Sequence, residues 1–226
     1  MSSWVYRVAG GLFAVTFLLA ACVGAKGGEL ENRLWKAAGA GDARAVERLL
    51  GQGATVDARD GEGRTALLLA THANQVEAAR VLIQAGADVN AKDAIQDSPY
   101  LYAGARGHLD ILQMTLAHGA DLRSTNRYGG TALIPAAERG HVETVRTLIG
   151  AGVAVDHVNR LGWTALLEAI ILGQGGASHV RIVELLIDAG ADVNLADGEG
   201  VTPLQHARRR HYHGIVNLLV RAGARG

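Results

Sequence analysis

The sequence predicts an all-α solenoid, in which short helix–turn–helix repeats stack side by side. A Thr or Ser recurs at intervals of 33, 33, 33 and 38 residues along the chain. A glycine recurs at the same period, and each period holds two short apolar-striped patterns with helical spacing. The Thr/Ser series is Thr65, Ser98, Thr131, Thr164 and Thr202, and the glycine series is Gly53, Gly86, Gly119, Gly152, Gly190 and Gly223.

The composition favours a folded protein and argues against a nucleic-acid binder or a disulfide-rich protein. Of the 226 residues, 49% are hydrophobic and 19% are charged, which favours a folded chain over a disordered one. The 22 Lys and Arg residues balance 22 Asp and Glu residues, so no net positive field attracts a nucleic acid. A single Cys excludes an internal disulfide framework and a site with several thiolate ligands.

The N-terminal segment has the pattern of a secretory signal peptide. After Arg7 no charge occurs until Lys26, and the intervening stretch is apolar and rich in small residues. We expect residues 1–21 to be this signal. An uncleaved membrane anchor is the alternative, because the apolar run of 18 residues is at the lower limit for crossing a bilayer.

The only cysteine lies at the end of this segment. The sequence Leu19-Ala20-Ala21-Cys22 resembles the lipobox of bacterial lipoproteins. The resemblance implies lipid attachment at Cys22, a tether over residues 22–28 and a mature domain over residues 29–226. Because Val23 stands where Asp often marks retention in the inner membrane, it implies the periplasmic face of the outer membrane. The alternative is cleavage after Ala25, which would release a soluble periplasmic protein.

Each period reads as two helices separated by a break. In one period, residues 131–138 form the first pattern, Gly140 breaks it, and residues 141–149 form the second. Such short helices are unstable alone in water, so each must bury its apolar stripe against a neighbouring repeat. The recurrent glycine then ends the second helix in a left-handed conformation.

The amino-acid sequences of the repeats resemble those of the ankyrin repeat family. The 33-residue period, the Gly-His pairs at residues 107–108 and 140–141, and the Gly-Ala-Asp-Val-Asn runs at 86–90 and 190–194 carry the resemblance. It implies repeats at about 29–60, 61–93, 94–126, 127–159, 160–197 and 198–226, joined by β-hairpin-like loops. The His that usually follows Thr-Pro-Leu in this family is missing, so we expect apolar packing to carry more of the contact between repeats.

Three local features modify the regular array. The five extra residues Gln174–Ser178 are expected to lengthen the connection between the two helices of the fifth repeat, as a tolerated insertion. Pro135 lies near enough to the start of a first helix to be accommodated. Residues 29–33 at one end and Arg208, Arg209 and Arg210 at the other are expected to be polar caps of the terminal repeats.

No catalytic motif is present in the sequence, and we expect no enzymatic activity and no cofactor. The one histidine group that suggests a metal site is His206, His211 and His213. The alternative is that His211 and His213 occupy the turn where other repeats place Gly-His. We expect no bound metal.

The family resemblance implies that a protein partner is bound by the hairpin tips and the first-helix face. The candidate residues are Ile95, Arg127, Tyr128, Arg160, Leu161 and Trp163. Tyr, Trp and Arg are enriched at interface hot spots. The alternative for Trp163 is packing on the neighbouring hairpin.

The sequence therefore predicts a monomeric, non-catalytic interaction scaffold tethered in the bacterial envelope through Cys22, with a protein partner and no nucleic acid. The resemblance also suggests two narrower roles, as an accessory factor in periplasmic peroxide defence or as an immunity protein against an envelope-directed toxin. An enzyme of unrecognised type is a distant alternative.

Overall fold

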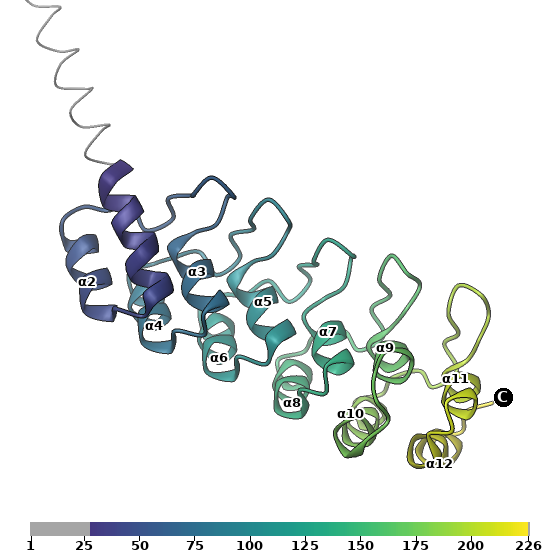
Figure 1. The fold of residues 1–226 in the computed structure, drawn as a ribbon. Helices are drawn as coiled ribbons and strands as arrows, with labels where there is room; N and C mark the ends of the chain where they lie inside the picture. Colours follow the sequence, from purple (N-terminus) through teal and green to yellow (C-terminus); the bar gives the residue numbers. More distant parts are fainter. Residues whose placement is uncertain (1–27, 226) are drawn as a thin grey trace, which may run out of the picture.

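The computed structural model describes residues 28–225, which form a curved stack of six helix pairs (Figure 1). This confirms the predicted all-helical solenoid. The predicted signal peptide, Cys22 and nearly all of the tether lie outside the described residues. Among the helices of residues 28–225, none combines the length and apolar character needed to cross a membrane.

Each pair consists of a first and a second helix. The first helices are the one described from residue 28 to residue 40, α3 (Ala66–His72), α5 (Pro99–Arg106), α7 (Leu133–Glu138), α9 (Ala165–Ile171) and α11 (Pro203–Arg209). The second helices are α2 (Ala43–Gly51), α4 (Val76–Gln84), α6 (Leu109–Ala117), α8 (Val142–Gly150), α10 (Ala177–Asp188) and α12 (His213–Arg221).

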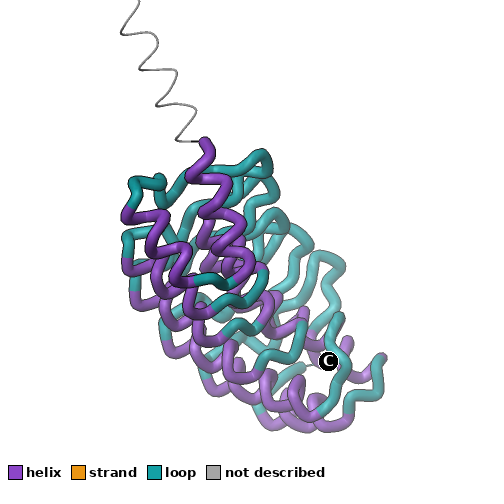
Figure 2. The backbone as a smooth tube through the Cα atoms, turned by 60° about the vertical axis from the view of Figure 1, so that its left-hand side comes forward, coloured by secondary structure: helices purple, strands orange, loops and turns teal. Residues whose placement is uncertain are grey.

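The molecule has three layers, with the loops on one side, the first helices in the middle and the second helices on the other side (Figures 1 and 2). The core lies between the two helical layers. Leu67, Leu133 and Leu166 of the first helices and Leu82 and Leu148 of the second are almost entirely shielded from solvent. The stack therefore buries the stripes that the individual helices could not.

The Thr/Ser series caps the first helices. The Thr65 hydroxyl accepts a hydrogen bond of 3.2 Å from the backbone N–H of Leu68, and Ser98, Thr164 and Thr202 cap α5, α9 and α11 in the same way. The glycines that follow the second helices all have φ between 82° and 94°. The left-handed helix ends predicted from the period are thus confirmed.

Thr131 is the exception in this series, because Pro135 lies four residues after it. In α9 the equivalent Thr164 carbonyl accepts from the N–H of Glu168, at 2.9 Å. Pro135 has no N–H, so the Thr131 carbonyl accepts from Ile134 instead, at 3.2 Å. The helix begins later, with Ala132 as its cap, and the buried Thr131 hydroxyl has no hydrogen-bond partner in the described part of the chain. Pro135 is accommodated, but α7 lacks the side-chain cap that Thr131 would otherwise provide.

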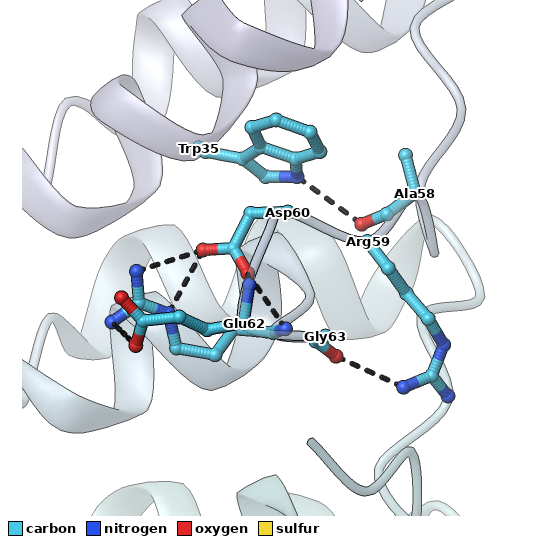
Figure 3. A network of polar contacts seen from close by, with 7 residues as sticks. Trp35, Ala58, Arg59, Asp60, Glu62 and Gly63 are labelled. Carbon is cyan, nitrogen blue, oxygen red and sulfur yellow. Dashed lines mark hydrogen bonds and ion pairs between the residues drawn. The ribbon is translucent and has the colours of Figure 1, made fainter. Parts of the chain in front are cut away.

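In each loop the side chain of an Asp or Asn stabilises the turn through hydrogen bonds to the backbone. In the first loop one Asp60 oxygen accepts from the N–H groups of Glu62 and Arg64, each at 2.9 Å, and the other pairs with the Arg64 side chain (Figure 3). Trp35 of the first helix donates its indole N–H to Ala58 in the same loop, at 3.1 Å. Asp93, Asn126, Asn159 and Asp197 hold the following loops by the same pair of backbone contacts.

Polar contacts join neighbouring repeats along the stack. Lys92 donates to the Thr125 carbonyl at 2.7 Å, and a ring nitrogen of His108 lies 3.0 Å from the Thr71 carbonyl oxygen. Asn90 donates to the Gly119 carbonyl at 2.9 Å. Apolar packing is therefore supplemented by polar contacts that use residues other than the missing histidines.

The insertion is placed differently from the sequence prediction. Helix α10 has 12 residues, whereas each of the other second helices has nine. Of the five extra residues, 174–176 therefore lie in the connection, whereas Ala177 and Ser178, together with His179, extend α10 by three residues. His179 in the added turn is buried, with Nε2 2.8 Å from the Glu138 carbonyl oxygen. The Tyr212 hydroxyl donates to Gly173 within the connection, at 2.9 Å.

The two ends of the stack also differ from one another. Arg208, Arg209 and Arg210 are exposed at the C-terminal end. At the N-terminal end Glu31 is buried and accepts a hydrogen bond of 2.8 Å from the N–H of Thr55. Residues 29–33 are therefore only partly a solvent-facing cap, because Glu31 fixes the first helix to the loop that follows α2.

Candidate functional site

A groove of about 480 Å³ lies between the loops and the first helices, in the middle of the stack. Its walls come from α5, α7 and α9, and from the loops that contain Asn126 and Asn159. Ile134 and Pro135 are buried in its floor. The side-chain caps of α5 and α9 and the Asn-based turns hold both walls, so the groove is preformed.

Exposed apolar side chains gather at this groove. Tyr128 and Leu161 are each 53% exposed, and Leu172 after α9 is 49% exposed. All three line the groove. Among the residues that the structure describes, only three other large hydrophobic side chains are comparably exposed, namely Ile95, Val158 and Val220. A local concentration of this kind is typical of an interaction site.

Asn159 and Glu168 link the loop to the floor of the groove. Asn159 accepts hydrogen bonds from the N–H groups of Leu161 and Trp163 at 2.9 and 3.0 Å. Its amide nitrogen donates to Oε1 of Glu168 at 2.7 Å. Burial, and then the nearby negative charge of Glu138, raise the pKa of Glu168 to about 7, against the lowering contributed by Asn159 and Arg139. Glu168 is therefore poised to change its charge near neutral pH.

Three exposed arginines lie along the same groove, and each is held by a group without a negative charge. The Arg106 guanidinium lies 5.6 Å from the centre of the Tyr102 ring, and that of Arg127 lies 4.9 Å from the Tyr128 ring. Arg139 donates to the Ala105 carbonyl at 2.6 Å.

The carboxylates of the groove are Asp97, Glu138 and Glu168. Burial, and then the charge of Asp93, raises the pKa of Asp97. None of the ion pairs found in residues 28–225 joins one of these carboxylates to a groove arginine. The groove thus contains both signs of charge without a direct ion pair between them, although the charge of Arg139 acts through space on Asp97 and Glu168.

The structure brings together three of the six candidate residues from the sequence. Arg127, Tyr128 and Leu161 line the groove, whereas Ile95, Arg160 and Trp163 do not. Arg160 fastens two loops together, because its backbone N–H donates to Tyr128 and its guanidinium to Arg127, each at 2.9 Å.

Sequence reasoning missed the polar floor of the groove. Asn159 and Glu168 are nine residues apart, and the same spacing separates Asp197 from His206, whose Oδ2 and Nε2 atoms lie 2.7 Å apart. This recurrent spacing of a loop Asp or Asn and a polar helical residue is a signal that could have identified Glu168. Leu172 was missed because it lies between the end of α9 and the insertion, where the repeat pattern is interrupted.

The histidines near the C-terminus have separate surroundings. His206 pairs with Asp197. His211 has φ of 58° and occupies a turn position at which Gly41, Gly107 and Gly140 have positive φ. No group of three or more His, Cys, Asp or Glu side chains within the described residues is arranged to hold a metal ion.

A second hollow of about 510 Å³ adjoins the groove and contains part of the insertion. Glu138, Arg139 and Leu172 line both hollows, and Gln174 and Ser178 line only the second. The groove therefore continues into a hollow beside the insertion.

Comparison with protein families gives matches along most of the chain. Residues 6–93 and 100–197 match the model of ankyrin repeats in three copies. Residues 175–220 match the model of ankyrin repeats in many copies. Over 57 residues the chain is 47% identical to the ankyrin repeat protein YahD of Escherichia coli K12, and this match covers 25% of the chain and 28% of that relative.

Solved structures share the fold. An ankyrin repeat domain from Acinetobacter baumannii AYE is 67% identical, with a TM-score of 0.83 and coverage of 85% of this chain and 98% of that domain. The ankyrin repeat protein EF0377 is 42% identical, with a TM-score of 0.81 and coverage of 84% and 98%. The ankyrin repeat domain of Bcl-3 is 29% identical, with a TM-score of 0.76 and coverage of 85% and 86%.

Proposed function

Because the chain belongs to the ankyrin repeat family, we propose that it is a non-catalytic scaffold that binds another protein in the groove lined by Tyr128, Leu161 and Leu172. The observation that carries this proposal is the concentration of three exposed apolar side chains in one preformed groove. A partner that covers them removes apolar surface from water.

The rigidity of the groove favours binding of this kind. Asn126 and Asn159 each fix a loop through two backbone N–H groups, and Arg160 ties those two loops together. A surface held in this way loses little conformational entropy when a partner binds. Arg127, stacked on Tyr128, supplies a cation beside an aromatic ring, a combination that is common at interface hot spots.

The proposal extends to the location of the protein. Lipid attachment at Cys22 would hold the repeats at the periplasmic face of the outer membrane. The seven residues from Cys22 to Glu29 span at most about 25 Å, at about 3.3–3.6 Å per residue. The partner would then be a protein in or near that membrane. Intact mass of the membrane-extracted protein tests this part, and an unmodified Cys22 would contradict it.

Photo-crosslinking in cells tests the binding surface. A photoreactive phenylalanine analogue replaces Leu161 in the groove or, as the control, Val220 on α12, which is similarly exposed at 51%. We expect a discrete crosslinked species from position 161 only. A Tyr128→Ala substitution in the same chain should abolish that species, whereas Val158→Ala should leave it unchanged.

Equal crosslinking from both positions, or a species that Tyr128→Ala does not affect, would show that this groove is not the binding surface. Thermal unfolding of each variant provides the control for folding. Because Tyr128 and Val158 are about half-exposed, neither substitution should lower the melting temperature substantially.

A further inference from the structure

We propose that the groove selects a lysine or arginine side chain of the bound protein, whose cation lies between the carboxylates of Glu168 and Glu138. This inference rests on the proposed function, because it names the group of the partner that the same groove recognises. The carboxylates would determine which partner binds, whereas the exposed apolar side chains indicate where a partner binds.

Glu168 occupies a position that other repeats fill differently. Four residues after the Thr or Ser mark, the other first helices carry Leu69, Tyr102, Pro135 and His206. Glu168 is only 6% exposed although it lines the groove. Burying a carboxylate is costly unless its charge is compensated. A carboxylate at this place in the groove therefore calls for a compensating group.

The described part of the protein donates a hydrogen bond to only one of the two oxygens of this carboxylate. Asn159 donates to Oε1, and within residues 28–225 no hydrogen bond reaches Oε2. Oε2 is nevertheless not fully shielded, so it remains accessible to solvent on a residue that lines the groove. Glu138, half-buried on α7, adds a second negative charge, and its effect on Glu168 is larger than the opposing effect of the Arg139 charge. A cation placed between them would stabilise both carboxylates.

The distribution of charge in the groove favours a cation over an anion. The carboxylates are buried or half-buried, whereas Arg106, Arg127 and Arg139 are exposed. Charges in a shielded place interact more strongly than charges on an exposed rim, where water and salt screen them. The arginines are also occupied by tyrosine rings and a carbonyl oxygen. Arg139 compensates Glu168 only through space, so the shielded carboxylates of the groove attract a positive charge more strongly than the exposed arginines attract a negative one.

The apolar surroundings suit the stem of such a side chain. Lysine and arginine carry several methylene groups below their charge, and these pack on apolar surface while the charge reaches a polar partner. Ile134 and Pro135 form the floor beside Glu138, while Leu161 and Leu172 stand at the edges. A small inorganic cation would leave this apolar surface uncovered, whereas a lysine or arginine covers it.

Selection from a library of random dodecapeptides displayed on phage tests the inference. The immobilised protein is used as wild type, as Glu168→Gln, which keeps an oxygen for Asn159, and as Glu47→Gln, an exposed carboxylate on α2. Peptides are assigned to the groove when Tyr128→Ala together with Leu161→Ala abolishes their binding. We expect groove peptides selected by wild type and by Glu47→Gln to share a Lys or Arg at one position, and those selected by Glu168→Gln to lack it.

A thermodynamic cycle then connects the two groups. Replacing the shared peptide Lys or Arg by norleucine should weaken binding to wild type at least about tenfold, and should have little effect on binding to Glu168→Gln. Groove peptides without a basic preference, or with the same preference in Glu168→Gln, would overturn this inference and leave the proposed function intact. Failure to select any groove peptide would contradict the proposed function as well.

Discussion

The amide of Asn159 and the carboxylate of Glu168 are joined by a hydrogen bond of 2.7 Å between a loop and the first helix that follows it. The same Asn159 fixes the turn of its loop through Leu161 and Trp163. One side chain therefore holds both the loop that presents Leu161 and the carboxylate at the base of the groove. Asp197 and His206 repeat the arrangement one repeat later, at the C-terminal end.

The first prediction concerns the pH dependence of stability. Burial and the charge of Glu138 raise the pKa of Glu168 from 4.5 to about 7, against the lowering by Asn159 and Arg139. Between these values the folded state binds the proton more tightly than the unfolded state, so the contribution of Glu168 to stability falls as pH rises. We expect Glu168→Gln to unfold at a higher temperature relative to wild type at pH 8 than at pH 5.

Glu47→Gln provides the control for this measurement, because it removes an exposed carboxylate on α2. Its difference from wild type in melting temperature should stay nearly constant between the two pH values. If Glu168→Gln behaves like this control, Glu168 ionises in the folded protein as it does in the unfolded chain, and the predicted coupling is absent.

The second prediction concerns the core. Tyr100 is completely buried at a position where Leu67, Leu133, Leu166 and Leu204 stand in other repeats, and its hydroxyl has no hydrogen-bond partner within residues 28–225. A buried hydroxyl without a partner costs about 1–3 kcal/mol. We expect Tyr100→Phe to increase the free energy of unfolding by about 1 kcal/mol in urea titrations. A loss of stability would reveal a partner for this hydroxyl.

The third prediction concerns a loop residue in an unfavourable backbone conformation. Gln96 has φ of 67°, and the equivalent residues in other loops are Gly63, Gly129, Gly162 and Gly200. A side chain in this conformation costs about 1–2 kcal/mol, and that of Gln96 is exposed. We expect Gln96→Gly to increase the free energy of unfolding by about 1 kcal/mol. As a control, Glu199→Gly, where φ is not positive, should decrease it.

The periodic features of the fold could be predicted from the sequence because each has a local physical cause. Thr65, Ser98, Thr164 and Thr202 mark helix starts, since their hydroxyls cap the first turn. The glycine series marks helix ends, since glycine tolerates positive φ. The repetition of these signals was sufficient to predict the stack.

The groove depends on departures from the period, which a repeat pattern does not predict. No other repeat has a Glu at the position of Glu168 or a Leu at the position of Leu172. Trp163 differs from Leu161 in exposure, although both belong to the same loop. The insertion Gln174–Ser178 was assigned wholly to a connection because it lies between the two helical patterns of the fifth repeat. In the structure the glycines do remain outside α10, whereas Ala177, Ser178 and His179 form an added helical turn in which His179 is buried against the neighbouring repeat.

The fourth prediction concerns Thr131 and Pro135. With Pro135→Ala, residue 135 regains an N–H that can donate to the Thr131 carbonyl, as Glu168 does to Thr164. The Thr131 hydroxyl, now without a partner in the described part of the chain, could then cap α7 through the N–H of Ile134. We expect an increase in the free energy of unfolding of about 1 kcal/mol, and slow hydrogen exchange at the new amide.

Pro99→Ala is the matched control, because Pro99 stands at the first position of α5, where no backbone N–H is needed within the helix. This variant should not gain stability. If Pro135→Ala is no more stable than wild type and its new amide exchanges rapidly, the late start of α7 has a cause other than the missing N–H. Packing of residues 131–134 between α5 and α9 would then fix the start of the helix.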